Sequence, residues 1–262
     1  MPSGRILRRL ATTGAAVALF LLACPRAAAQ QNLFNVPSGK ITDLGELFFQ
    51  EQFNFSRPIG SSNTTFDLGL GHNFELGVNM LDVFFYENGP PEAPGAHQMN
   101  PDVLFNGQKG FELVDEVWSL GIGTQMGFNP APKTRDMRYQ AFAWAINEFK
   151  MPEERGSLYA GVYYANIAYG GRGDRGGGLF GVEVPIVKDR FHFQADYITG
   201  NRDISVAVIG GVFFFPNKWQ LSVGAQVPTF RSHTPTGIVV ELTHPGFRIF
   251  KSKHTEPNRE LD

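Results

Sequence analysis

The chain has 262 residues, a net charge of −2, and a composition of 42% hydrophobic and 18% charged residues that includes 24 Phe and 30 Gly. This length is enough for one large all-β domain, and the lack of a basic stripe in the sequence excludes nucleic acid as an expected partner. No run of 18 or more apolar residues occurs, which argues against a transmembrane helix in the mature protein.

Residues 1–29 have the pattern of a signal peptide for export. Three arginines precede a short apolar stretch from Ala15 to Ala23, and small residues at positions 27–29 give a cleavage site before Gln30. A lipoprotein signal is an open alternative, because the residues that end at Cys24 (LLAC) resemble a lipobox. The sequence therefore does not decide the type of signal peptidase.

Cys24 is the only cysteine in the chain, so cleavage after Ala29 would leave the mature protein without one. This excludes disulfides, thiolate catalysis and cysteine metal sites from the mature protein. Residues 1–29 also hold four of the 23 basic residues and none of the 25 acidic ones, so their removal leaves a net charge of about −6.

The residues that follow divide into an arm and a long run of strands. Residues 30–45 are mainly polar and contain Pro37-Ser38-Gly39, which predicts a short N-terminal arm. From residue 46 to residue 243, apolar and polar residues alternate over stretches of about ten residues, the pattern of a strand with one apolar and one polar face. We predict twelve strands, with ten or fourteen as open alternatives, at residues 46–55, 62–70, 74–85, 102–111, 117–126, 137–147, 157–166, 179–184, 191–198, 204–214, 219–227 and 237–243.

The connections between the predicted strands alternate between short and long. Turns such as 71–73 and 215–218 are tight, whereas 86–101 is long, and 56–61 is assigned to the longer set. An up-and-down transmembrane barrel has this alternation, with short turns in the periplasm and longer loops outside. An even number of strands then places the N-terminal arm and the tail at 244–262 in the periplasm.

Aromatic residues begin several of the predicted strands. Phe74, Trp118, Phe191 and Trp219 each come first on the lipid side after a short turn. They would lie at one level of a barrel, as the aromatic girdle at a membrane interface does. The alternative is that large rings begin the core strands of a soluble β-domain.

These features resemble the bacterial outer-membrane β-barrels of the porin-like, presumed-transporter type. The resemblance rests on the hairpin at Gly71-His72-Asn73 and the turn at Phe215-Pro216-Asn217-Lys218-Trp219, and it covers about residues 46–243. It implies an all-β, up-and-down antiparallel transmembrane barrel in a Gram-negative outer membrane, with membrane lipid and the barrel-assembly machinery as partners. It also implies passive transport. The tail at 244–262 departs from the family, whose members usually end on an aromatic residue.

Successive side chains of a strand point to opposite faces, so residues an odd number of positions from the strand-starting aromatic residue are expected to face the lumen. Acidic residues in a narrow aqueous path favour cations, but polar side chains also fill small barrels by pairing with one another, and both interpretations stay open. The predicted lumen-lining residues are Glu51, Asp67, Glu75, Asn79, Gln125, Arg138, Gln140, Glu183, Gln194, Asp196, Gln220, Gln226 and Glu241.

The sequence contains no recognised motif for catalysis or metal binding. Gly-x-Ser-x-Gly and His-Glu-x-x-His are both absent, and the six histidines have no ligand spacing. His192 and Asp196 share one face of a predicted strand, but residues four apart on a strand are about 13 Å apart, too far for a hydrogen bond. We therefore expect no catalytic residue, no metal, no cofactor and no enzymatic activity, although a triad drawn from several strands would leave no local pattern.

The function that the sequence favours is a passive channel for small hydrophilic solutes or ions in the bacterial outer membrane. A structural or surface-interaction barrel, with a lumen filled by side chains, is the main alternative, and a barrel enzyme is the third. The sequence does not identify the solute or the number of subunits.

Overall fold

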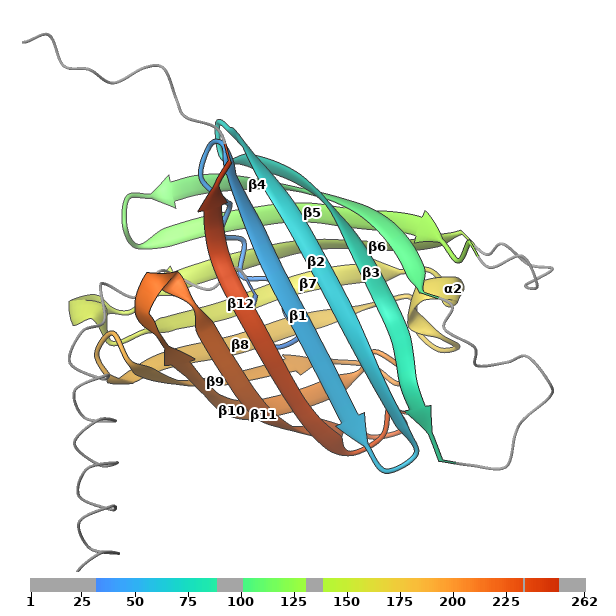
Figure 1. Cartoon of the computed structure of the whole chain (residues 1–262). Helices are drawn as coiled ribbons and strands as arrows, with labels where there is room; N and C mark the ends of the chain where they lie inside the picture. Colours follow the sequence, from blue (N-terminus) through green and yellow to red (C-terminus); the bar gives the residue numbers. More distant parts are fainter. Residues whose placement is uncertain (1–31, 89–100, 131–138, 233, 250–262) are drawn as a thin grey trace, which may run out of the picture.

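The protein is a closed β-barrel. The computed structural model describes residues 32–88, 101–130, 139–232 and 234–249, so the export signal, Cys24 and Arg138 lie outside the described residues. Twelve antiparallel strands follow one another around the ring, and the first, β1 (Glu46–Ser56), pairs with the last, β12 (Gly237–Arg248), to close it (Figure 1). The predicted all-β, up-and-down barrel of twelve strands is confirmed.

Each predicted strand corresponds to one observed strand. The two shortest predictions, 179–184 and 237–243, are longer in the structure, because three glycines and a proline hide the alternation of apolar and polar residues at their ends. Residues 244–248, predicted as tail, therefore belong to the barrel. The strands are β1 (Glu46–Ser56), β2 (Ile59–Gly71), β3 (Phe74–Glu87), β4 (Asp102–Val114), β5 (Trp118–Phe128), β6 (Gln140–Lys150), β7 (Ser157–Ala165), β8 (Gly176–Val187), β9 (Phe191–Ile198), β10 (Val206–Phe214), β11 (Gln220–Pro228) and β12 (Gly237–Arg248).

Side chains alternate between an apolar outer face and a polar inner face. On β5, Ile122 and Met126 are exposed on the outside, whereas Gln125 is buried inside. The outer residues Phe105 and Val162 are both 63% exposed. This arrangement is the reverse of a soluble β-sandwich, in which apolar side chains meet in a dry interior.

The two ends of the barrel differ in their connections. β1 begins and β12 ends at the same end, since Glu46 pairs with Arg248, and the tight turns also lie at this "turn end". The predicted hairpin after β2 is present: His72 and Asn73 have φ of 53° and 55°, as a type I′ turn requires. The opposite "loop end" carries the longer connections, such as the one between β7 and β8.

One connection at the loop end is shorter than expected. The segment 56–61 was predicted as a longer loop, but only residues 57 and 58 separate β1 from β2. The strands continue because Ser56 and Ile59 are bonded to each other: the Ser56 hydroxyl donates to the Ile59 carbonyl at 2.7 Å and accepts from its N–H at 3.2 Å. This prediction was wrong.

The helical elements are short. They are η1 (Pro152–Glu154), α2 (Ile167–Gly170) and η2 (Pro216–Lys218). The side chain of Asn166 caps α2 by accepting from the N–H of Tyr169 at 2.9 Å, which fixes this tyrosine at the loop end of the lumen. Within the described residues, no helix has the length and apolar character needed to cross a membrane.

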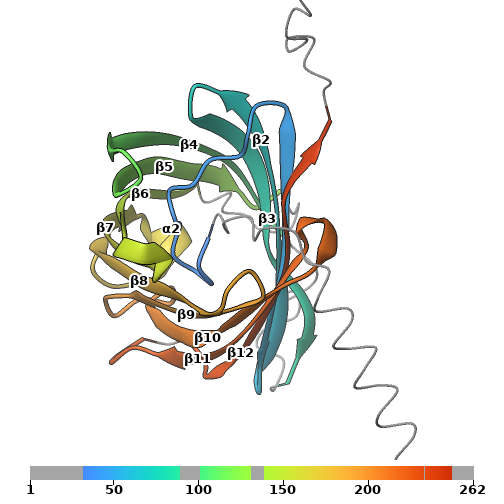
Figure 2. The same ribbon diagram turned by 90° about the vertical axis from the view of Figure 1, so that its left-hand side faces the viewer.

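The N-terminal arm lies inside the barrel. Residues 32–45, called "the arm" below, pass within the ring of strands before β1 begins at the turn end (Figure 2). The apolar side chains of Leu33, Phe34 and Val36 are almost completely buried there. An arm was predicted at this place in the chain, but its position inside the lumen was not.

Candidate functional site

Apolar residues of the arm pack into two clusters on the lumen wall. Leu33 and Val36 join a cluster that includes Phe142 and Tyr159, and Phe34 joins a second one. Glycines in the wall make this packing feasible: a Cβ at Gly181 would come within 2.0 Å of the Leu33 side chain, and one at Gly224 within 2.8 Å of the Phe34 ring. The wall therefore has a shape that fits this arm.

The arm also approaches the wall with its backbone. Gly39 has a φ of +77°, a conformation that favours glycine, and it lies against Gly121 of β5. A Cβ at Gly121 would come within 2.5 Å of the Gly39 Cα. Farther along, a Cβ at Gly110 would be 3.0 Å from the Ile41 side chain. No ordinary side chain fits between arm and wall at Gly121.

Acidic side chains of the wall bind backbone N–H groups of the arm. Asp196 Oδ2 accepts from Asn35 N at 2.5 Å and from Val36 N at 2.9 Å. Glu75 Oε2 accepts from Thr42 N at 2.7 Å. Charged acceptors make the stronger class of hydrogen bond, and buried N–H groups need a partner, so the two carboxylates anchor the arm.

Amide side chains complete the attachment. Gln52 Nε2 donates to the Phe34 carbonyl at 3.3 Å, and Gln108 Nε2 donates to the Lys40 carbonyl at 3.1 Å. Gln52 also donates to Asn35 Oδ1 at 3.2 Å. These bonds come from β1 and β4, whereas Asp196 is on β9, so strands on different sides of the barrel hold the same segment.

Lys40 is the centre of an ionic cluster. Its Nζ lies 3.4 Å from Glu148 and 3.9 Å from Glu183, and it donates to the Tyr159 hydroxyl at 3.1 Å. His192 Nδ1 is 2.7 Å from the other oxygen of Glu183. Burial lowers the pKa of Lys40, but Tyr159, Glu183 and Glu148 together outweigh it, and the net pKa is above the ordinary value. The ammonium therefore stays charged.

Most of the predicted lumen-lining residues lie on the inner face, but several of them contact the arm rather than open space. Glu75 and Asp196 bind its backbone, and Glu183 pairs with Lys40 and His192. Arg138 lies outside the described residues. The predicted residues that are buried on the inner face are Asp67, Glu75, Asn79, Gln125, Gln140, Glu183, Gln194, Asp196, Gln220, Gln226 and Glu241.

Glu51 was assigned to the lumen, and this assignment was wrong. In β1 the inner positions are those of Gln50 and Gln52, so Glu51 points outward with its register partners Thr64 and Leu242. Its carboxylate accepts from the Thr64 hydroxyl at 2.6 Å. The error is a slip of one residue, which moves a side chain to the opposite face of a strand.

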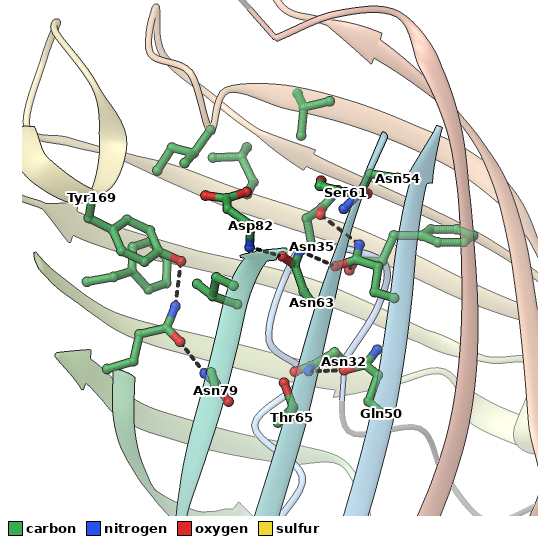
Figure 3. A pocket seen from close by; sticks show the side chains of 18 of the residues that line it. Asn32, Asn35, Gln50, Asn54, Ser61, Asn63, Thr65, Asn79, Asp82 and Tyr169 are labelled. Carbon is green, nitrogen blue, oxygen red and sulfur yellow. Dashed lines mark hydrogen bonds between the residues drawn. The ribbon is translucent and has the colours of Figure 1, made fainter. Parts of the chain in front are cut away.

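Between the arm and the loop end, the lumen contains a cavity of about 390 Å³. Its described lining includes Asn32 and Asn35 of the arm, Asn54 near the end of β1, and Tyr169 of α2 (Figure 3). Asp203 and Pro235, from loop-end connections, also line it. The cavity thus extends from the arm to the loop end.

A chain of hydrogen bonds runs along one wall of the cavity. Asn106 Nδ2 donates to Asn79 Oδ1 at 2.8 Å. Asn79 Nδ2 donates to Gln125, and Gln125 Nε2 donates to the Tyr169 hydroxyl (Figure 3). Burial, and then the nearby carboxylate of Asp82, raise the pKa of Tyr169, so its hydroxyl keeps its proton. The chain fixes the orientation of each amide.

Loop-end connections are fixed by a buried arginine. Arg202 is fully buried, and its guanidinium donates to the carbonyls of Ala165 at 2.8 Å and Gly173 at 3.3 Å. The Arg202 carbonyl accepts from Ser232 at 2.8 Å. These contacts join the connections that follow β7, β9 and β11 beside the mouth of the cavity.

Several residues of the site were missed in the sequence. Asn106, Gln108 and Glu148 occupy inward-facing positions of β4 and β6. Applying the alternation along these strands to every polar residue would have placed all three in the lumen. The Leu33, Phe34 and Val36 side chains are apolar residues in an otherwise polar segment, which is a signal of burial. Nothing in the sequence predicted that Lys40 would meet Glu148 and Glu183.

Fold and site together define a closed antiparallel barrel with an apolar exterior and a polar lumen occupied by its own N-terminal arm. In the part of the chain that the structure describes, no three His, Cys, Asp or Glu side chains are grouped to hold a metal ion. No family model matches the sequence, and no curated protein matches it. Among solved structures, the chain is similar to an outer membrane channel from Pseudomonas putida F1, with 11% identity over 79% of this chain and 96% of that chain and a TM-score of 0.48.

Proposed function

We propose that the protein is a bacterial outer-membrane barrel. The belt of exposed apolar side chains around a closed ring supports this, because water would solvate such a surface poorly and lipid tails solvate it well. Aromatic pairs on the outer face near the turn end, including Trp118 with Phe149 and Phe191 with Phe213, fit a membrane interface. The export signal expected at residues 1–29 agrees with this location.

Within that membrane the barrel is a passive channel for small hydrophilic solutes or ions, and the arm restricts it. The observation that carries this proposal is the position of the arm across a polar lumen whose remaining space extends to the loop end. Solutes enter the cavity at the loop end, and movement of the arm opens the way to the turn end. The process needs no cofactor, no energy source and no catalytic step.

A second candidate is a structural barrel that the arm closes permanently. The number of separate attachments favours it, because Asp196, Glu75 and Lys40 each bind the arm to a different part of the wall. In that case the loop-end cavity would be a blind pocket, and solutes would not cross the membrane.

Liposome swelling distinguishes the two candidates. Vesicles that contain the full mature chain are compared with vesicles that contain a chain lacking residues 32–42, after far-UV circular dichroism has shown equal strand content. The channel proposal predicts slow but measurable swelling in small sugars for the full chain and faster swelling for the deletion. No swelling with the full chain and fast swelling with the deletion would favour the closed barrel. No swelling with either would end the channel proposal.

A further inference from the structure

The cavity above the arm has the size and the lining of a binding site for a small molecule. Its volume of about 390 Å³ falls in the range of roughly 300–1,000 Å³ that such sites occupy. Amide side chains, each of which can donate and accept, surround it on several strands. Those among the described lining residues are Asn32, Asn35, Gln50, Gln52, Asn54, Asn63, Asn79, Asn106, Gln108, Gln125, Gln140 and Gln226.

The charged residues of the described lining are all acidic. Asp67, Glu75, Asp82 and Asp203 contribute carboxylates, and the described lining contains no lysine, arginine or histidine. Glu75 is already bound to the arm at Thr42. The described lining thus contributes negatively charged groups and no positively charged group, so an anionic ligand is disfavoured.

Aromatic rings form one wall of the cavity. Phe142 stacks on Tyr169 with centroids 5.0 Å apart, and it lies 5.4 Å from Trp144. Trp144 Nε1 donates to Gln108 Oε1 at 3.2 Å, which holds the indole in place. Flat, fixed rings of this kind pack against the apolar C–H face of a ring-shaped ligand.

Asp67 provides a hydrogen-bond acceptor that no described residue uses. Asp67 is only 6% exposed and lines the cavity, and its Oδ1 has no hydrogen-bond partner among the described residues. The side chain of Asn106, which begins the chain that ends at Tyr169, lies beside Asp67 over Gly77. A buried carboxylate oxygen without a donor is costly, and a turn of the Asp67 side chain toward the cavity would let a ligand hydroxyl supply that donor.

From these features we infer that the cavity binds a neutral, hydroxyl-rich ring compound, of the size of a mono- or disaccharide. Amides that donate and accept match hydroxyl groups, the Phe142–Trp144–Tyr169 wall matches the C–H face of a sugar ring, and Asp67 accepts from one of its hydroxyls. This inference rests on the proposed function, since it names the class of solute that enters the loop end.

Trp144 gives a direct measurement of binding. The chain has three tryptophans, and Trp118 and Trp219 lie on the outer face of the barrel, so a W118F/W219F variant leaves Trp144 as the only reporter. The full mature chain with these two changes is titrated in detergent with glucose, maltose, L-arginine and sodium phosphate. The inference predicts a saturable change in Trp144 fluorescence with glucose or maltose and none with phosphate.

Two further variants test the contacts. Asp67→Asn keeps the shape of the side chain but replaces a charged acceptor with a neutral one. It should weaken sugar binding about tenfold, because a hydrogen bond to a charged group is about twice as strong as one between neutral groups. Phe142→Leu should weaken it by removing the stacked ring. Glu241→Gln is the matched control: Glu241 is also a buried acid of the inner face, but it does not line the cavity, so binding should be unchanged.

Three results would overturn the inference: no saturable change with either sugar, a saturable change with arginine alone, which would indicate a cation site, or equal losses for Asp67→Asn and Glu241→Gln. The titration needs no transport, so it separates the two proposals. Sugar binding without liposome swelling would remove the channel and keep the site. Swelling without a fluorescence response would remove the site and keep the channel.

Discussion

Gly39 of the arm and Gly121 of β5 lie in backbone contact, so that a Cβ at Gly121 would come within 2.5 Å of the Gly39 Cα. Gly121→Val should therefore push the arm away from the wall. Lys40 directly follows Gly39 in the sequence. Trypsin cleaves after an accessible lysine, so its cleavage at Lys40 reports whether the arm has been displaced. We expect the folded parent chain to resist cleavage at Lys40 and the variant to be cut several-fold faster.

The control for this experiment is Ile122→Val, an outward change at the next residue of the same strand. It should leave the cleavage rate at the parent level. If Gly121→Val were cut no faster than the control, the arm would not be held against β5.

Removal of the Asp196 carboxylate should release the arm near Asn35 and Val36. Asp196→Ala leaves two N–H groups of the arm without their charged acceptor, and each such bond contributes about 1.5–3 kcal/mol. We expect faster trypsin cleavage at Lys40 and a lower urea midpoint of unfolding. Asp196→Asn retains an oxygen that can accept, so it should show a smaller effect. Equal behaviour of both variants and the parent would contradict the anchoring role.

The ionic cluster gives a stability prediction. Lys40→Met leaves Glu148 and Glu183 with little exposure and without their cation, and breaking such a pair typically costs about 3–5 kcal/mol. The further changes Glu148→Gln and Glu183→Gln remove the two buried charges that Lys40 balanced and should recover much of the loss. Urea unfolding in vesicles measures both steps, and a triple variant no more stable than Lys40→Met would exclude an electrostatic cause.

The same cluster predicts a pH dependence. The pKa of Lys40 is raised in the folded chain, so its stabilisation is present at every pH below its unfolded value of about 10.4 and is lost only as the pH rises through the folded value. The difference in unfolding free energy between the parent and Lys40→Met should therefore stay constant from about pH 7 to pH 9. A difference that decreased by half over this range would show that Lys40 loses its proton there.

Glu51 tests whether the outer face meets lipid. Its carboxylate lies among apolar outward side chains, and its hydrogen bond within the described residues is to the Thr64 hydroxyl. Replacing both residues, Glu51→Leu with Thr64→Val, should stabilise the barrel in vesicles by about 1–2 kcal/mol, since a carboxylate on the lipid face costs less than the roughly 2–4 kcal/mol of a basic residue. A destabilised double variant would indicate that this face is covered by protein rather than lipid.

The strands were predictable because alternation of apolar and polar residues is a local property of the sequence. The prediction of strands failed where the side chains give no alternation, as at Gly176 to Gly178 in β8. In β1 the inward and outward positions were exchanged at Glu51. Turn chemistry was also local, and the hairpin at His72-Asn73 was identified from it.

The interior of the barrel was less predictable, because it depends on contacts between distant parts of the chain. Val36 and Asp196 are separated by 160 positions in the sequence, and no periodicity relates them. The parity of Asp196 indicated an inward carboxylate but not that the arm would use it. The cavity wall required Tyr169 from α2 and Asn79 from β3 to meet at Gln125, which only the closed ring produces.

Single-channel current in a planar bilayer tests most directly the claim that the arm restricts this lumen. Full mature chain and a chain without residues 32–42 are recorded in the same lipid and salt. The account predicts small or rare current steps for the full chain and discrete, severalfold larger steps for the deletion. Identical step sizes for the two chains would contradict it.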